Sequence, residues 1–494
     1  MSRPLRPPAA LAPYVPSAAD PWDADKARHL IRRTGLGVRR ADVEAVLALS
    51  PADAVAEVVG RAASRAPYAE PSWLSIRRPP SDAPQSEKDA YDDANGDGLR
   101  EVYRGAYDRL MGGAQPAVLD RLAVALRERL TVFWSSHFVT EYRTHNVATW
   151  LWRFRAILDR HALGDFRQAV RDVGVTPAML SYLNGDQNRS GRPNENYARE
   201  LFELFTMGPD GPDGAPNYTQ ADVTEAARAL TGWRTDRRAE VDAYFDASRF
   251  DAGDKTILGR TGPWGTDDVP TILFEERAPQ IAAFVARALH REFVSEEPDA
   301  DAEAALADLL LDADFQIGPV VEALFASALF FGEAARAAVI KSPLEGLLGA
   351  VYAFGVDRLD DDSWGRYRWL SSTLNQDLVN PPDVFGWRDG RAWIDTSTLT
   401  ERARRARDEV WRRSAALYAD AKARPSAYVA RDLVADLAAD HLARIPTDAE
   451  LDDLTEVLLA GTPAYAWDPT ASGADKRVRG LMQHLVSLPE YQLR

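Results

Sequence analysis

Ionisable side chains are concentrated in residues 194–233, a stretch whose pattern predicts two short helices joined by a Gly- and Pro-rich loop. Carboxylates can serve as general acids or bases, and guanidinium groups can hold an anionic or oxyanionic group. The side chains concerned are Glu195, Arg199, Glu200, Glu203, Asp222, Glu225 and Arg228. This stretch is therefore the strongest candidate for a functional site, with Asn194 and Asn196 as further substrate-binding candidates at its start.

Glu200 is expected to face the core side of its helix, beside leucines and a phenylalanine. A buried carboxylate needs a partner, and the candidates are Arg199, Arg228 and His137. Glu225 can instead pair with Arg228 in water, where such pairs contribute about 0–1 kcal/mol. We therefore expect Glu200→Gln to be more harmful than Glu225→Gln.

The charged residues also have purely structural explanations. Thr219 and Asp222 form the T-x-x-D variant of a capping box at the start of the second helix. Glu225 and Arg228 are three residues apart, which suits a surface ion pair. A structural ion-pair network produces the same residue pattern as an active site.

His137 lies on the apolar face of a long helix predicted over about residues 117–142. It is either a core histidine or a general base at the bottom of a pocket. Glu141 and His145 continue the same stripe at i+4 and i+8. The two histidines would then be about 12 Å apart, too far to share one metal ion. With no cysteine in the chain, we expect no metal centre and no cofactor.

Residues 235–265 predict the only β-like part, a short hairpin or extended loop that carries Lys255. Loops of this kind often carry function, so Lys255 is a candidate for substrate binding. The coil of residues 375–393 is rich in Pro, Gly and Trp. Its aromatic residues either cap a core or close a pocket.

Residues 77–98 are polar, begin with prolines and are interpreted as an exposed insertion. They contain Asp93, Asn95 and Asp97 at the alternating positions of a calcium loop. The position of the strongest ligand is occupied by Arg104, which favours a solvated turn and leaves calcium binding open.

The length alone would allow two to four domains, but the run of helical segments along the chain predicts a mainly α protein with one large helical domain over residues 23–494, after a disordered Pro-rich arm at residues 1–22. The 46% hydrophobic content suffices for a large core, and the net charge of −16 opposes nucleic acid as a partner. The sequence contains no run of 18 apolar residues that could span a membrane, and no signal peptide is visible. We therefore expect a soluble, acidic, cytoplasmic protein.

Several motifs occur in a fixed order along most of the chain. They are A-R-H-L-I-R-R-T-G-L-G (Ala27–Gly37), F-W-S-S-H-F-V-T (Phe133–Thr140), H-A-L-G-D-F (His161–Phe166), the paired helices above, D-K-T-I-L-G (Asp254–Gly259), K-S-P (Lys341–Pro343) and N-P-P-D-V-F-G-W-R-D-G-R-A-W-I (Asn380–Ile394). This order resembles the bacterial family called domain of unknown function 1800, from about Asp25 to the last residue.

The resemblance implies a fold and a motif map but no reaction. Members of this family often look exported, and they are often encoded beside sulfatase-like proteins, so the resemblance also implies a sulfatase-like partner protein. Where the family usually has a histidine in H-D-x-G, this chain has Phe250-Asp251-Ala252-Gly253. A site that needed that imidazole would be altered here.

Two functions remain open. In the first, the chain is a hydrolase or transferase that acts on a polar substrate, a glycan or an anion, with Glu195, Glu200 and His137 as acid–base groups. His137, Glu200 and Arg199 or Arg228 would then line one cavity, with Lys255 at its mouth and residues 380–393 closing it. In the second, the chain is a non-catalytic helical binding or scaffold protein, and the charged motifs are a structural network.

Overall fold

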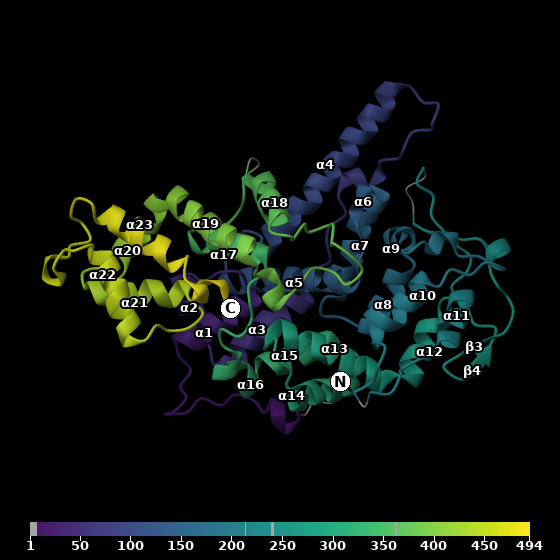
Figure 1. The fold of residues 1–494 in the computed structure, drawn as a ribbon, viewed down its shortest axis with the longest axis horizontal. Helices are drawn as coiled ribbons and strands as arrows, with labels where there is room; N and C mark the ends of the chain where they lie inside the picture. Colours follow the sequence, from purple (N-terminus) through teal and green to yellow (C-terminus); the bar gives the residue numbers. More distant parts are fainter. Residues whose placement is uncertain (1–6, 213, 239–241, 361–362) are drawn as a thin grey trace.

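The computed structural model describes residues 7–212, 214–238, 242–360 and 363–494, and it confirms the mainly α fold (Figure 1). The helices up to the central stretch are α1 (Ala24–Thr34), α2 (Arg40–Leu47), α3 (Pro51–Ser64), α4 (Gln85–Leu110), α5 (Val118–His137), α6 (Tyr142–His145), α7 (Ala148–His161), α8 (Phe166–Gly174) and α9 (Pro177–Tyr182). The central stretch forms α10 (Asn196–Glu200), the π-helix η4 (Leu201–Thr206) and α11 (Gln220–Ala229).

The remaining helices follow, with longer connections before α12 and before α19. They are α12 (Asp268–Glu276), α13 (Ala278–Phe293), α14 (Ala300–Asp312), α15 (Ile317–Phe325), α16 (Ala328–Phe331), α17 (Pro343–Ala353), α18 (Ser363–Thr373), α19 (Thr396–Arg412), α20 (Ser414–Ala423), α21 (Ala430–His441), α22 (Asp448–Leu459) and α23 (Ala474–Leu485). Within the described ranges, none of these helices combines the length and the apolar character needed to cross a bilayer.

Short 3₁₀ helices lie between the α-helices. They are η1 (Ala9–Leu11), η2 (Ser72–Ser75), η3 (Gly185–Gln187), η5 (Ala247–Arg249), η6 (Glu333–Ala335), η7 (Gly390–Trp393), η8 (Ala464–Ala466) and η9 (Pro489–Gln492).

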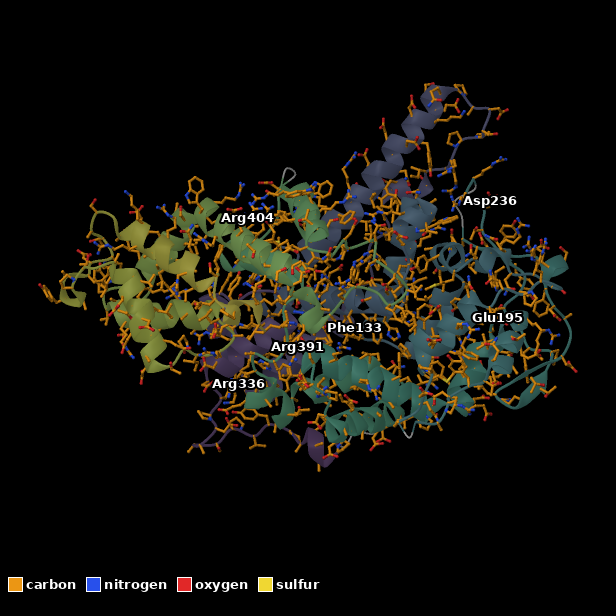
Figure 2. All side chains as sticks on the ribbon, viewed as in Figure 1. Phe133, Glu195, Asp236, Arg336, Arg391 and Arg404 are labelled. Atoms are coloured by element: carbon orange, nitrogen blue, oxygen red, sulfur yellow. The ribbon has the colours of Figure 1, made fainter. Side chains whose placement is uncertain are left out.

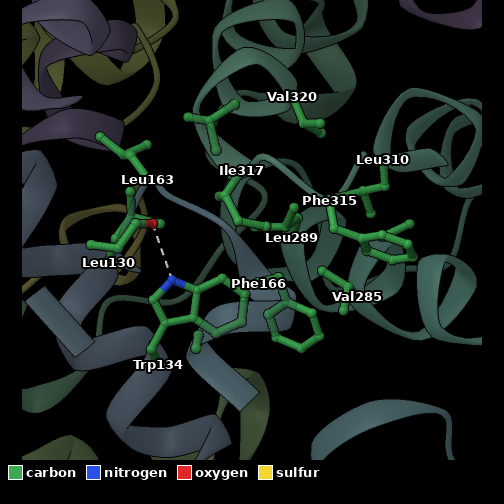
Figure 3. Close-up of a cluster of buried hydrophobic side chains, with 14 of the residues drawn as sticks. Leu130, Trp134, Leu163, Phe166, Val285, Leu289, Leu310, Phe315, Ile317 and Val320 are labelled. Atoms are coloured by element: carbon green, nitrogen blue, oxygen red, sulfur yellow. Dashed lines mark hydrogen bonds between the residues drawn. The ribbon is translucent and has the colours of Figure 1, made fainter. Parts of the chain in front are cut away.

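The largest hydrophobic core joins helices from the first two thirds of the chain, including α5, α7, α8, α13 and α15. Trp134 and Phe166 pack against each other at its centre, with ring centroids 5.3 Å apart. The indole N–H of Trp134 donates to the carbonyl of Ala162 at 3.1 Å, so this buried polar group is satisfied (Figure 3). This core packs on the face of α5 next to the one that lines the cavity described below.

The end of the chain packs around a separate hydrophobic core. Helices α19–α23 form it together with Ala350 and Phe354 from the end of α17. In Figure 1 these helices occupy one end of the molecule, whereas α11, α12 and the strands β3 and β4 occupy the other. Helix α17 also packs Leu344, Leu347 and Leu348 into a third core with α4 and α18, so it connects this third core to the core at the end of the chain.

The N-terminal segment does not form the expected free arm over residues 7–22. Leu11 is fully buried, and the Tyr14 N–H donates to the Ala326 carbonyl at 2.8 Å. The Ala328 N–H returns a bond to the Ala12 carbonyl at 2.8 Å. The prolines exclude a helix longer than the single turn η1 but suit this extended pairing. Residues 1–6 of the predicted arm lie outside the described residues.

The favoured interpretation of a solvated turn is wrong, and the calcium loop that was left open is not formed either, because Asp93, Asn95 and Asp97 lie inside α4. Side chains two residues apart point to different sides of a helix and cannot converge on one ion. Asn95 instead accepts the Ala148 N–H at 2.8 Å, and Asp97 pairs with Arg100. The part of the predicted insertion before Gln85 is non-helical and mostly exposed, and α4 projects from the rest of the molecule (Figure 1).

The predicted long helix ends earlier than expected, at His137. Phe138 leaves helical geometry with φ −99° and ψ 79°, and the β-branched Val139 and Thr140 follow. Glu141 and His145 therefore do not continue the stripe of His137, since they lie at α6. The predicted separation of the two histidines along one helix was wrong for this reason.

The predicted β-like part consists of two small antiparallel pairs. Strand β1 (Trp233–Arg234) pairs with β2 (Tyr244–Phe245), and β3 (Lys255–Ile257) pairs with β4 (Arg260–Gly262). The second pair is a tight hairpin that turns at Leu258-Gly259, both with positive φ. The expectation of a hairpin near residues 235–265 is thus confirmed.

Candidate functional site

A cavity of about 380 Å³ opens where α5, α13 and the start of α17 meet the coil of residues 376–393. Helix α5 contributes Arg129, Phe133 and His137, which follow one another at four-residue steps on one face. Phe133 lies near the middle of the molecule (Figure 2). A partly open, largely apolar cavity with a few polar groups is the usual form of a small-molecule site.

His137 lies at one end of this cavity. Its Nε2–H donates to the Phe205 carbonyl at 2.8 Å, since a carbonyl oxygen can only accept. Nδ1 is therefore the basic nitrogen, and no hydrogen bond to it is found among the described residues. The ring is surrounded by Trp134, Phe166 and Phe284 at centroid distances of 5.4, 5.8 and 6.0 Å.

The environment keeps His137 neutral. Burial lowers its pKa to about 4, against a smaller upward effect of the hydrogen bond to Phe205. The result is a neutral imidazole whose Nδ1 lone pair is available to a ligand in the cavity.

The sequence explains why the Phe205 carbonyl is free to accept this bond. In an α-helix it would accept from the N–H of residue 209, but Pro209 has none. The helix widens into the π-helix η4 at this point, and the N–H groups of Met207 and Gly208 both turn back to the Phe202 carbonyl. A π-turn of this kind frequently marks a functional site.

The other end of the cavity holds a buried charge network. Glu345 binds Arg129 through both guanidinium η-nitrogens and lies 3.1 Å from Nε of Arg494. Arg494 also donates to Glu292 at 2.7 Å. Burial alone would raise the pKa of Glu345, but the charges of Arg129 and Arg494 outweigh it and lower the pKa to about 2.

The coil of residues 384–393 forms one wall of the cavity. The Trp387 N–H donates to Oγ of Ser136 at 3.1 Å, and the Arg391 N–H donates to Glu296 at 3.1 Å. Gly386 has φ +85°, and a Cβ at this position would collide with the Ser136 carbonyl. The expectation that this segment closes a pocket agrees with its place here, and Trp387 also serves packing, since it is buried.

Glu195 and Arg199 lie outside the cavity lining and connect α10 to α11. Glu195 accepts from Thr224 at 2.7 Å, from Gln220 at 2.9 Å and from Arg199 at 3.0 Å. The hydrogen bond from Thr224, with Gln220 and Arg199, lowers the pKa of Glu195 despite the opposing effect of burial. In Figure 2, Glu195 stands well apart from Phe133 of the cavity. The geometry explains both residues as a structural brace.

The charged face of α11 holds the edge of strand β3. Asp222 accepts the Leu258 N–H at 2.7 Å, and Glu225 accepts the Thr256 N–H at 3.1 Å. Arg228 donates to the Asp254 carbonyl at 3.1 Å. Asp222 also completes the predicted capping box with Thr219. Asp222, Glu225 and Arg228 follow at three-residue steps on one face of α11. Their partners, residues 258, 256 and 254, follow at two-residue steps along the strand, so these bonds fix the position of the hairpin on α11.

Lys255 is not at the mouth of a cavity but 1% exposed beneath the hairpin. Its ammonium group binds the Asp251 carbonyl and lies 4.6 Å from the centroid of Phe250. Burial lowers its pKa. Arg228 forms a two-pronged ion pair with Asp251, at 2.9 and 3.2 Å. These contacts tie the segment before β3 to α11.

Glu200, Asn194 and Asn196 are also outside the cavity lining. Glu200 is half-buried, and burial and Glu203 raise its pKa. No hydrogen bond or ion pair of its carboxylate is found among the described residues. Asn194 accepts the Asn196 N–H at 3.0 Å and so forms a turn before α10. Of the predicted site residues, the structure brings only His137 into the cavity, so the expected shared cavity is not formed.

Residues that the sequence interpretation missed complete the site. Arg129, Glu292, Glu345 and Arg494 come from four separate segments. One local signal existed, because Arg129 lies eight residues before His137 on the same face of a predicted helix. The remaining residues are far away in sequence, and Glu345, for example, meets Arg129 across 216 residues. Among the described side chains, no group of three or more His, Asp or Glu is arranged to hold a metal ion.

The comparison with known families decides the relationship of the chain. A family model described as a protein of unknown function (DUF1800) matches residues 29–493. The chain belongs to this family. No curated protein and no solved structure matches it.

The motifs that carried the DUF1800 resemblance divide between the cavity and its supports. F-W-S-S-H-F and the coil at residues 380–394 line the cavity, and K-S-P begins α17 beside it. The paired helices α10 and α11 and the D-K-T-I-L-G strand contribute mainly to bracing. Phe250, at the position of the family histidine, packs on Lys255 and is not part of the cavity lining.

Proposed function

We propose that the protein is a hydrolase or transferase whose substrate occupies the cavity and whose general base is His137. The observation that carries the proposal is the fixed tautomer of His137, whose Nε2–H is held by the Phe205 carbonyl while Nδ1 is free of protein partners within the described chain. A positioned base of this kind contributes about 10²–10⁴ to a rate.

The proposed step is proton abstraction from a substrate hydroxyl or from water by Nδ1 of His137. The resulting imidazolium keeps its Nε2–H bond to Phe205, and this bond strengthens as the ring becomes charged. With a pKa of about 4 in the empty cavity, the ring is a weak base. A bound negative group would raise that pKa towards neutrality and make the base stronger.

The second candidate is a binding protein, with a glycan or a sulfatase-like protein as its partner. Two observations favour it. Glu195 pairs with Arg199 and Thr224, and Arg228 pairs with Glu225, as the members of a structural network do. Phe385 is 71% exposed at the cavity, and exposed aromatic rings suit stacking on sugars.

The two candidates separate in a comparison of His137→Gln with His484→Gln. Glutamine can still donate to the Phe205 carbonyl but has no basic nitrogen, whereas His484 is exposed on α23 away from the cavity. Wild-type protein is assayed against 4-nitrophenyl glycosides, phosphates, sulfates and acetate.

We expect turnover of at least one ester or glycoside, a loss of about 10²–10⁴ in kcat for His137→Gln, and no change for His484→Gln. The kcat/KM of the wild type should fall as the pH drops through the pKa of His137. Turnover that His137→Gln leaves intact would refute the base. Binding without any turnover would favour the second candidate.

A further inference from the structure

The charge of the cavity differs in sign from the charge of the whole chain. Five arginines and four acidic residues line the cavity, so that the lining has an excess of positive charge, while the chain carries −16. The arginines are Arg129, Arg287, Arg291, Arg388 and Arg494, and the acidic residues are Glu292, Glu296, Glu345 and Asp389. A positive cavity in an acidic protein selects a negative ligand.

Two of these arginines are buried yet keep unused donors. Arg494 is 4% exposed and Arg129 is 6% exposed. Nη1 of Arg494 and Nε of Arg129 have no hydrogen-bond partner in the part of the chain that the structure describes. A buried donor without an acceptor is costly, and both side chains line the cavity, where a ligand can offer an acceptor to the guanidinium groups.

Gln376 adds a neutral donor to the same end of the cavity. Its side chain is 3% exposed, and its Oε1 accepts the Leu344 N–H at 2.8 Å. This bond assigns the Nε2 amide as a donor, and no acceptor for it is found among the described residues. Because Leu344 lies in the first turn of α17, the amide is held firmly in place.

We propose that Arg494, Arg129 and Gln376 form a subsite for an oxyanion, the carboxylate, sulfate or phosphate group of a small substrate. The rest of that substrate packs on the apolar wall of Phe133, Phe284 and Trp387. Guanidinium and amide N–H groups suit such oxygens in number and direction. The inference rests on the proposed function, because it takes the occupant of the cavity to be the substrate, and it selects an anion over a neutral glycan.

Binding is measured by titration calorimetry on the full chain with four probes that share an aromatic ring. Phenylacetate, phenyl sulfate and phenyl phosphate carry the three oxyanions, and benzyl alcohol is the neutral control. We expect at least one anion to bind ten times or more tightly than benzyl alcohol. The ranking of the three anions tells which oxyanion the subsite prefers.

Variants then test the residues themselves. Arg494→Gln should weaken anion binding at least tenfold, and Gln376→Leu should weaken it about threefold to tenfold while keeping every charge. Arg407→Gln, an exposed site on α19, is the matched control and should bind like the wild type. If Arg494→Gln fails to fold by circular dichroism, Gln376→Leu decides.

The test of the anion subsite can be separated from the test of His137 as a general base. His137→Gln should bind the preferred anion within about twofold of the wild type, because it lacks only the basic nitrogen. Equal binding of benzyl alcohol and all three anions, no binding of any anion, or wild-type affinity in folded Arg494→Gln and Gln376→Leu would each overturn the subsite. None of these results depends on turnover.

Discussion

Gly386 is the residue through which the cavity wall docks on α5, and Gly386→Ala should test that docking. Its φ of +85° lies in the left-handed region, where an alanine costs about 1–2 kcal/mol. A Cβ there would also collide with the carbonyl oxygen of Ser136, a backbone atom that cannot rotate away. Overpacking of this kind costs about 1–3 kcal/mol more.

A matched control isolates the second contribution. Gly355, just after α17, has φ +90°, and a Cβ there would meet no atom within 4 Å. Gly355→Ala should therefore cost only the backbone term of about 1–2 kcal/mol. Gly386→Ala should exceed it by about 1–3 kcal/mol, the cost of displacing the coil from Ser136.

The assay is urea unfolding followed by circular dichroism, together with tryptophan emission of the native state. Displacement of the coil would shift the environment of Trp387, whose N–H bonds to Ser136, so Gly386→Ala should also change native emission. Gly355→Ala should leave native emission unchanged. Equal destabilisation by the two substitutions, with unchanged emission in both, would refute the docking argument.

Two further predictions concern buried charge. The sequence-based ranking of Glu200 and Glu225 should reverse. Glu200→Gln should leave unfolding free energy at pH 7 unchanged or raise it, because burial and Glu203 already disfavour the ionised carboxylate. Glu225→Gln should lower it by about 1 kcal/mol through weaker bonds to Arg228 and Thr256, and urea midpoints in the opposite order would contradict this. Burial, with nearby arginines, lowers the pKa of Lys341 to about 7, whereas an unfolded lysine titrates near 10.4. Between these two pH values the unfolded chain carries one more proton than the folded chain. The free energy of unfolding should therefore rise from pH 7 towards pH 10, by up to about 1.4 kcal/mol per pH unit. Lys341→Met should remove that part of the rise, as measured by urea unfolding at several pH values.

The sequence by itself determined the mainly helical fold and where several of the helices begin. Ser50 caps α3 and Pro51 occupies its first position, and Thr219 and Asp222 close the predicted capping box of α11. These features depend on residues within four positions of one another, so local spacing is sufficient to predict them. The small hairpin was predictable for the same reason. Pro209 has no N–H, so the sequence also indicates that the Phe205 carbonyl lacks its usual partner within the helix.

Only the tertiary structure decided which charged groups face the cavity. Asp93, Asn95 and Asp97 match half of a calcium loop in spacing, yet the helix α4 separates their side chains. The carboxylates and guanidiniums of α10 and α11 look like a site in sequence, but their partners lie on the adjoining helix and strand. His137 meets Phe205 across 68 residues, and Arg129 meets Glu345 across 216. A side chain's chemistry depends on its partners and its burial, and for these residues both are set by segments that sequence spacing does not bring together.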